Sequence, residues 1–245
     1  MVVLFNFQFS RWTFYKHLTP RKSITLCQYK STSNFSHFVT VTFRQKIQIN
    51  LYVDTLLQWN KRMNLTAVKE VNEVMERHVE DSLAILPPLS DSHRSHCSTS
   101  IDKLKLVDIG TRAGLPGVIL AIARPDWDIN LLESMNKLCV FVVGVIGSSN
   151  IQMLRGRAQS LGENLCFREK FDIPVARAVA ETRILAEYCL MLVRVGGLFI
   201  AAKGHDPEDE VMKAESALKK MGASLLQVCS GFLNCSSPVI DGKTK

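Results

Sequence analysis

Apolar residues recur at helical spacing between residues 47 and 86. Ile49, Val53 and Leu56 lie four and then three residues apart, which predicts an amphipathic helix. A second apolar face at residues 71–86 predicts another helix, which Pro87 and Pro88 are expected to end. The polar residues 60–66 between them are typical of a turn. The pattern therefore predicts a helical extension at residues 47–90.

The apolar pattern changes after residue 104, where short apolar runs alternate with helical segments. The predicted strands are residues 104–109, 129–132, 151–154, 171–176, 198–202 and 224–228. The predicted helices lie at residues 115–123, just after 154, and at 181–193 and 207–221. Strands that alternate with helices form βαβ units, so we expect an α/β domain at residues 104–229 with a mostly parallel sheet.

The stretch between these two parts is rich in serine and is expected to be a flexible linker, residues 91–103. It contains His93, His96 and Cys97, which are three possible metal ligands. No second cluster accompanies them, so a linker is favoured over a metal site, and no metal is expected. Residues 230–245 are expected to form a tail.

Charge is distributed unevenly along the 245 residues. Residues 1–46 contain seven Lys and Arg and no acid, so they account for the whole net charge of +7. Basic, serine-containing and acid-free segments are typical of organellar transit peptides, which we expect here. The alternative is a basic arm that binds RNA. No run of about 20 apolar residues predicts a membrane span, and seven cysteines without a C-x-x-C pair indicate free thiols in a reducing compartment.

A glycine-rich turn follows the first predicted strand of the α/β domain. Gly110 and Gly114 allow the backbone to approach a ligand, and Glu133 at the end of the second strand can accept ribose hydroxyls. This pattern fits a nicotinamide dinucleotide or S-adenosylmethionine. Asp108, two residues before Gly110, favours a cofactor with an ammonium group and no pyrophosphate.

The order of several short motifs resembles the glucose-inhibited division protein B family over residues 51–228. The motifs are Trp59-Asn60-Lys61, Asn64-Leu65-Thr66, Arg77-His78, Asp81-Ser82, Asp108-Ile109-Gly110-Thr111, Gly114-Leu115-Pro116-Gly117, Gly156-Arg157-Ala158, Ala176-Arg177-Ala178 and Lys203-Gly204. The family consists of methyltransferases that modify guanine N7 in small-subunit ribosomal RNA. The resemblance implies a class I S-adenosylmethionine-dependent methyltransferase with a Rossmann-like fold. It also implies a monomer whose partner is this RNA or the ribosomal subunit, without a membrane. With the expected transit peptide, the chain resembles a plant organellar member, in the chloroplast or alternatively in the mitochondrion.

The resemblance also implies roles for individual residues. Cofactor contacts fall on Gly110, Leu115, Ala158, Gln159 and Arg177. Asp108 of the first strand, Gly114 of the glycine-rich turn and Glu133 at the end of the second strand complete the expected cofactor residues. A surface ion pair is the alternative role for Arg177.

Guanine N7 carries a lone pair, so its methylation requires no general base. Catalysis is then expected to depend on positioning and electrostatics. The candidates for holding the base or the RNA are Asn64, Arg77, His78 and Lys203. As alternatives, His78 is a hydrogen-bonded core histidine, and Arg77 pairs with Asp81 only to stabilise its helix.

The sequence departs from the family at several places. Arg112 occupies a position that is normally glycine and would cost about 1 kcal/mol if its φ were positive. Gln159 stands where an acid is usual, residues 137–150 form a short segment, and the C-terminal strand pair is incomplete, which would expose a sheet edge. The alternative is therefore a non-catalytic relative that binds RNA but not cofactor. A nicotinamide-dependent oxidoreductase is disfavoured because Arg112 interrupts the G-x-G-x-x-G pattern.

Overall fold

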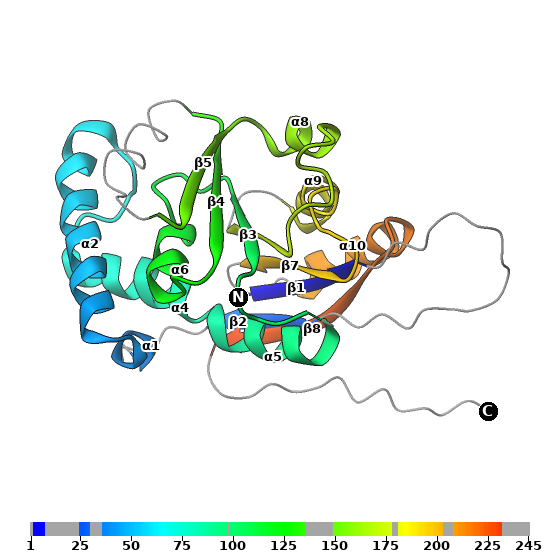
Figure 1. The fold of residues 1–245 in the computed structure, drawn as a ribbon, viewed down its shortest axis with the longest axis horizontal. Helices are drawn as coiled ribbons and strands as arrows, with labels where there is room; N and C mark the ends of the chain where they lie inside the picture. The colour runs from blue at the N-terminus through cyan, green and yellow to red at the C-terminus, as the bar shows by residue number, and fades with distance from the viewer. Residues whose placement is uncertain are drawn as a thin grey trace, which may run out of the picture.

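Five parallel strands form the central sheet of the computed structural model (Figure 1). They are β3 (Lys105–Ile109), β4 (Asp128–Glu133), β5 (Ile151–Arg155), β6 (Ile173–Arg177) and β7 (Gly197–Ala202). Their order in the sheet is β5-β4-β3-β6-β7. From β3 the chain adds β4 and β5 on one side, and it then adds β6 and β7 on the other side of β3, so the topological switch point lies between the neighbouring strands β3 and β6. Ligands bind at such switch points in open α/β sheets, outside the carboxyl ends of the strands. The predicted Rossmann-like α/β fold is confirmed.

The structure describes residues 2–7, 25–29, 36–97, 99–135, 149–177, 181–202 and 208–231. Most of the 137–150 segment, the tail beyond residue 231 and Lys203 lie outside these residues. Within them, no helix is both long enough and apolar enough to pass through a membrane. No group of three or more His, Cys, Asp or Glu side chains in the same residues is arranged to hold a metal ion.

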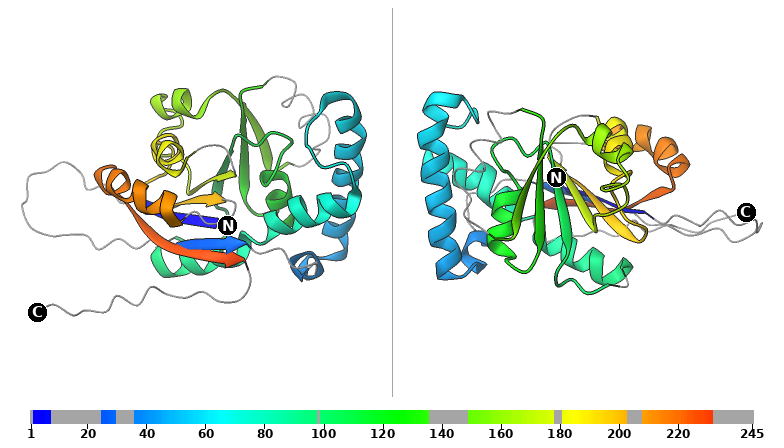
Figure 2. Two further views of the ribbon diagram at one scale, coloured as in Figure 1. Left: turned by 180° about the vertical axis from the view of Figure 1, so that it is seen from behind. Right: turned by 45° about the horizontal axis from the view of Figure 1, so that its top comes forward.

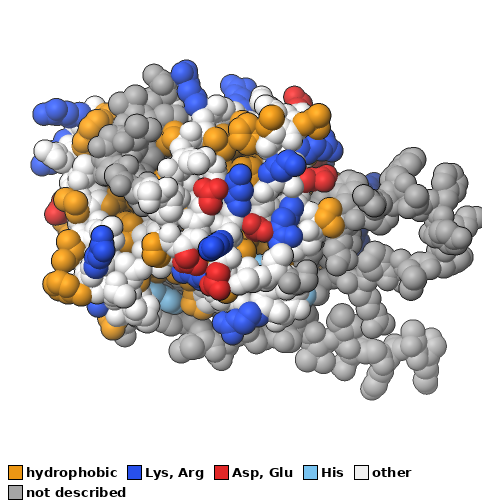
Figure 3. All heavy atoms as spheres, in the orientation of Figure 1, with side chains coloured by type: hydrophobic (Ala, Val, Ile, Leu, Met, Phe, Trp, Pro, Cys, Tyr) orange, Lys and Arg blue, Asp and Glu red, His pale blue; other side chains and the backbone are white. Residues whose placement is uncertain are grey.

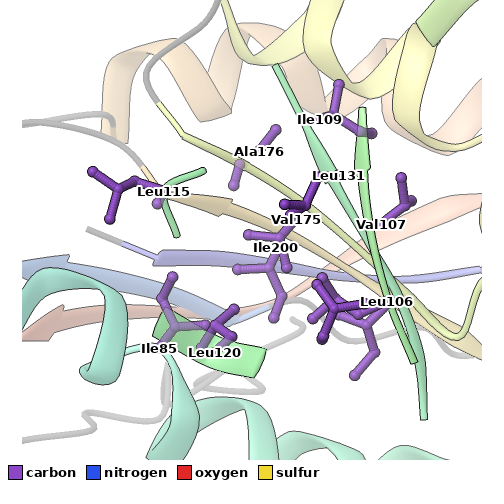
Figure 4. Packing of buried hydrophobic residues seen from close by; sticks show 14 of the residues in the cluster. Ile85, Leu106, Val107, Ile109, Leu115, Leu120, Leu131, Val175, Ala176 and Ile200 are labelled. Carbon is purple, nitrogen blue, oxygen red and sulfur yellow. The ribbon is translucent and has the colours of Figure 1, made fainter. Parts of the chain in front are cut away.

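Helices lie on both sides of the sheet. Figure 2 shows α6 (Gly117–Ala123) with the N-terminal helices on one side. On the other side lie α8 (Ala158–Glu163), α9 (Thr182–Cys189) and α10 (Glu208–Lys220). Strand β7 is apolar and buried throughout, as expected for a strand covered on both faces, whereas β5 is only partly buried. Leu106, Leu131, Val175 and Ile200 are fully buried in the core between the layers (Figure 4).

The N-terminal extension is helical, as predicted, but it begins earlier. Helix α1 (Ser36–Thr40) is followed by α2 (Phe43–Met63), so α2 starts four residues before the expected boundary at 47. Thr42 and Gln45 form a reciprocal capping box at the start of α2. The structured part of the chain therefore includes residues that the sequence assigned to the transit peptide.

The second predicted helix is divided into three pieces. Helix α3 (Val71–Val74) continues into the π-helical turn η1 (Met75–Glu80) and then into α4 (Asp81–Leu83). The prolines do not end this region but start helix α5 (Leu86–His96), with Ser92 and His93 buried. The first turn of a helix tolerates proline because its N–H groups have no intrahelical partner. The prediction of a flexible linker is therefore wrong for residues 91–96.

The last described strand, β8 (Ala223–Gly231), has neighbours on both edges. Strand β1 (Val2–Phe7) pairs with it antiparallel, and β2 (Thr25–Tyr29) pairs with it parallel. The expectation that an incomplete C-terminal strand pair would leave this edge exposed is therefore wrong. Both partner strands come from the segment expected to be a transit peptide.

Candidate functional site

The loop after β3 has an unusual backbone that its glycines permit. Gly110 and Gly114 have φ of 70° and 96°, and a Cβ on Gly114 would lie 2.5 Å from Cγ2 of Val118. Arg112 also has a positive φ, of 52°. Residues with a side chain are strained at positive φ. Arg112 is therefore expected to reduce the stability of the fold at this position.

Asp108 supports this loop from the end of β3. The side chain is 1% exposed, and its Oδ2 accepts hydrogen bonds from the Thr111 hydroxyl (2.6 Å) and the Gly117 N–H (2.9 Å). The other oxygen, Oδ1, is buried and has no hydrogen-bond partner among the described residues. Burial raises the pKa of Asp108 to about 6, against the lowering effect of its two donors and of Arg177. The site therefore contains a buried carboxylate oxygen whose hydrogen-bonding capacity the described residues leave unmet.

Glu133 fastens the same loop to β4. Its Oε2 accepts the Arg112 N–H over 2.9 Å, and its Oε1 accepts the Met135 N–H over 2.8 Å. Its Oε1 also accepts the Ser134 hydroxyl over 3.4 Å, so a ligand hydroxyl at this carboxylate would share or replace one of these donors. Glu133 ends its strand as predicted, but it also holds the loop, a role that the sequence did not indicate.

Tyr52 on α2 is a site residue that the sequence reasoning missed. It is 3% exposed, and its hydroxyl donates to the Ala113 carbonyl over 2.7 Å. Burial raises the pKa of Tyr52 far above its usual value, so the hydroxyl stays protonated. Tyr52 lies three residues after Ile49, and this helical spacing would have placed it on the buried face.

Arg177 ends β6, the strand next to β3. One of its terminal nitrogens, Nη1, is buried without a hydrogen-bond partner among the described residues. Burial lowers the pKa of Arg177, while the nearby carboxylates of Asp81 and Asp108 raise it. Arg177 thus belongs to an internal charge cluster, and the alternative of a surface ion pair is wrong.

His78 lies on η1 and faces the same cluster. Its Nε2 lies 2.8 Å from the Thr66 hydroxyl. Burial and the charge of Arg177 lower the pKa of His78 to about 4, so the imidazole is neutral at pH 7. The Asn60 side chain in turn donates to the Thr66 and Val68 carbonyls and accepts the Thr66 N–H, which fixes the 64–68 turn.

The other substrate candidates take different positions. Asn64 ends α2 in a left-handed conformation with φ of 50°, and its N–H donates to the Asn60 carbonyl. Arg77 is exposed and pairs with Glu73 over 2.7 Å, so its expected pairing with Asp81 is wrong. The structure does not describe Lys203.

Two cofactor candidates begin α8, directly after β5. Ala158 and Gln159 follow the N-cap residue Arg157, as the strand-to-helix pattern predicted. The preceding Gly156 donates its N–H to the Glu133 carbonyl, so the start of α8 lies beside the end of β4. Leu115 is buried within the glycine-rich loop. The ends of β3, β4, β5 and β6 thus bring the candidate cofactor residues to one edge of the sheet.

Comparison with known proteins assigns the family. A sequence profile described as GidB, rRNA small subunit methyltransferase G, matches residues 45–236. The ribosomal RNA small subunit methyltransferase G of Symbiobacterium thermophilum is 40% identical over 186 residues, which are 73% of this chain and 72% of that protein. The protein of this name from Desulforamulus reducens is 37% identical over 209 residues, 84% of this chain and 82% of that protein. The chain belongs to the methyltransferase G family.

Solved structures match less closely. The Methanococcus jannaschii fibrillarin pre-rRNA processing protein is 17% identical, covers 49% of this chain and 56% of its own, and has a TM-score of 0.42. The fold assignment therefore relies on the strand order and on the methyltransferase G family match. This match begins at residue 45 and ends at residue 236, so it extends beyond the expected limits of 51 and 228 at both ends.

Proposed function

We propose that this chain transfers a methyl group from S-adenosylmethionine to N7 of a guanine in small-subunit ribosomal RNA. Membership of the methyltransferase G family supports the reaction. The structural observation that carries it is the pair of buried, unpartnered atoms Asp108 Oδ1 and Arg177 Nη1 at neighbouring strand ends. An unpartnered buried acceptor and donor are costly in a folded protein unless a ligand completes them.

The residues present fit S-adenosylmethionine. Asp108 Oδ1 can accept from its ammonium group, and Glu133 can accept from its ribose hydroxyls. Ala158 and Gln159 would lie along the adenine of the cofactor. Arg177 would contact the amino-acid part of the cofactor. When bound, the cofactor supplies a methyl group on a sulfonium, which is the electrophile.

The chain's own residues hold the guanine and move no proton from it. N7 attacks with its existing lone pair, so His78 is not needed as a base, and its low pKa keeps it neutral. A neutral imidazole oriented by Thr66 can instead hydrogen-bond to the base edge. Asn64, Arg77 and Lys203 are proposed to hold the RNA around it. Reaching the methyl group requires the guanine to leave its stack.

We propose that the protein acts as a monomer. Its substrate is the ribosomal RNA, either free or within the small subunit. Figure 3 shows Lys and Arg interspersed with Asp and Glu on one face, so this face is not a uniform basic surface. From Ile47 onward the chain has 23 basic and 23 acidic residues. We therefore expect RNA affinity from local groups near the sheet edge and a shallow salt dependence.

The chloroplast is the proposed location, with the mitochondrion as the alternative. The acid-free, basic segment before Ser36 supports import. A fluorescent protein fused to residues 1–35 should enter the organelle in plant cells. Cytosolic fluorescence would contradict the transit peptide and favour the basic RNA-binding arm.

The full-length chain tests the reaction. Small ribosomal subunits from a strain lacking this methylation are incubated with the protein and labelled S-adenosylmethionine, and N7-methylguanosine is measured after digestion of the RNA. Asp108→Asn should lower incorporation at least tenfold at cofactor concentrations below the wild-type Kd. A folded wild-type chain that shows no heat of binding at millimolar cofactor would favour the non-catalytic relative.

A further inference from the structure

We propose that Tyr52 is a positioning residue for the cofactor loop, so that the helical extension supports cofactor binding and not only RNA binding. The inference rests on the proposed methyl transfer from S-adenosylmethionine. Its basis is one buried contact, the 2.7 Å hydrogen bond from the Tyr52 hydroxyl to the Ala113 carbonyl. Ala113 lies between the two positive-φ residues Arg112 and Gly114.

The loop at residues 110–117 is held by side chains from three directions. Asp108 binds it from its own strand through Thr111 and Gly117. Glu133 binds it from β4 through the Arg112 N–H. These two contacts hold hydroxyl and N–H donors of the loop, whereas Tyr52 is the donor to a loop carbonyl. Each contact thus restrains a different part of the loop.

Helix α2 is itself fixed, so Tyr52 has a defined position. Gln45, in the first turn of α2, donates from Nε2 to the Ile122 and Ala123 carbonyls at the end of α6, over 2.9 and 3.0 Å. Ile49, Val53 and Leu56 on the same helix are buried in the core. The loop and the helix that follows it, α6, are therefore both docked against α2.

Loss of the Tyr52 hydroxyl would act directly on the loop. The Ala113 residue is 2% exposed, so its carbonyl would have no water to replace the lost donor. The hydroxyl also lies 3.6 Å from the position that a Cβ on Gly114 would take, so it packs against the tightest point of the turn. Without it, the loop can leave the conformation in which Thr111 and Gly117 hold Asp108 Oδ2 and the Gly110 backbone lies at the end of β3.

Tyr52→Phe in the full-length chain tests this role, because the ring and its packing remain. We expect the Kd and KM for S-adenosylmethionine to rise roughly five- to tenfold, with kcat changed less than about twofold. Hydrogen exchange of the unliganded protein should show faster exchange at the Gly114 and Leu115 amides, which donate to the Thr111 carbonyl. Exchange in β4 should be unchanged.

Thr55→Val is the matched control, because it removes a hydroxyl on the same helix that donates to the Leu51 carbonyl within α2 and does not touch the loop. It should leave the cofactor Kd within about twofold. An unchanged Kd in Tyr52→Phe, or an equal rise in Thr55→Val, would overturn the positioning role. If the wild type binds no cofactor, both proposals fail, and the exchange difference would then show whether Tyr52 still holds the loop.

Discussion

The Thr111 hydroxyl donates to Oδ2 of Asp108 over 2.6 Å, and this bond leaves Oδ1 of the same carboxylate buried and unpartnered. Asp108→Asn can keep the donors from Thr111 and Gly117 on its amide oxygen. The amide nitrogen, a donor, then takes the place of Oδ1, so the acceptor that an ammonium group needs is lost. We expect the Kd for S-adenosylmethionine, measured by calorimetry, to rise at least tenfold. A Kd within twofold of wild type would contradict the role of Oδ1.

The same substitution should stabilise the unliganded protein at pH 7. Burial raises the Asp108 pKa from 3.8 to about 6, so the ionised carboxylate opposes folding above that pH. Asp108→Asn should raise the free energy of unfolding by about 1–3 kcal/mol at pH 7 to 8. The gain should shrink as the pH falls from 6 toward 4, where the wild-type carboxyl protonates. Urea unfolding at pH 7.5 and 4.5 measures both values.

Cofactor binding should weaken in acid for the same reason. A ligand α-amino group stays protonated below about pH 7.7, so only the protein changes charge. As the pH falls below about 6, Asp108 gains a proton and loses its attraction for the ammonium group. Arg177 and Glu133 also act on this carboxyl, with opposite signs. Calorimetry between pH 7 and 5 should show a rising Kd for wild type and a flatter profile for Asp108→Asn.

The strand pattern predicted most of this site, because parallel strands end at one edge of their sheet. Asp108 and Glu133 could therefore be placed at this edge from their positions in the strand pattern, whereas the role of Arg177 came from the family resemblance. The helices were harder to predict, since Pro87 and Pro88 resemble a terminator but begin α5. The contact of Tyr52 with Ala113 joins residues 61 positions apart, and a local pattern carries no signal for such a pairing.

His78 should act without titrating near neutral pH. Its pKa of about 4 means that the folded protein opposes protonation of this side chain. The contribution of His78 to the free energy of unfolding is therefore fully present above its unfolded pKa near 6.5. It is lost as the pH falls toward 4. His78→Gln should reduce the acid-induced loss of stability in urea unfolding. If His78 instead titrates with a pKa near 6.5 by NMR, its burial beside Arg177 is wrong.

Thr66→Val tests the orientation of that imidazole. The valine keeps the shape of the side chain but removes the hydroxyl 2.8 Å from Nε2 of His78. We expect kcat for ribosomal RNA methylation to fall several-fold while the cofactor Kd stays unchanged. Ser95→Ala is a suitable control, because its hydroxyl bonds only to the Asp91 carbonyl within α5. A parallel loss in both variants would indicate a general effect on folding.

Arg112→Gly separates an active enzyme from an inactive relative. Glycine removes the positive-φ strain and keeps the N–H bond to Glu133, so stability should rise by up to about 1 kcal/mol. Since the Arg112 side chain is exposed, the cofactor Kd should change less than about threefold. Glu169→Gly, at φ of 55° and outside the loop, is the matched control. Binding in Arg112→Gly but not in wild type would support the non-catalytic alternative.

The position of any transit-peptide cleavage should matter because residues 36–46 are part of the fold. Glu80 is 2% exposed and accepts N–H bonds from His37 and Phe38, while Thr42 and Gln45 cap α2. A chain starting at Ser36 should therefore be more stable in urea than one starting at Ile47, by about 2–4 kcal/mol. Both lack β1 and β2, so the exposed edges of β8 affect them equally.

Glu80→Gln in both truncated chains identifies the source of that difference. In the chain from Ser36, the substitution weakens a carboxylate that is held by several donors, so stability should fall. In the chain from Ile47 those donors are gone, and replacing a buried charge with an amide should be neutral or stabilising. Equal effects in the two chains would show that the contacts of α1 with Glu80 do not stabilise the fold. Cleavage after residue 46 would then be compatible with a folded protein.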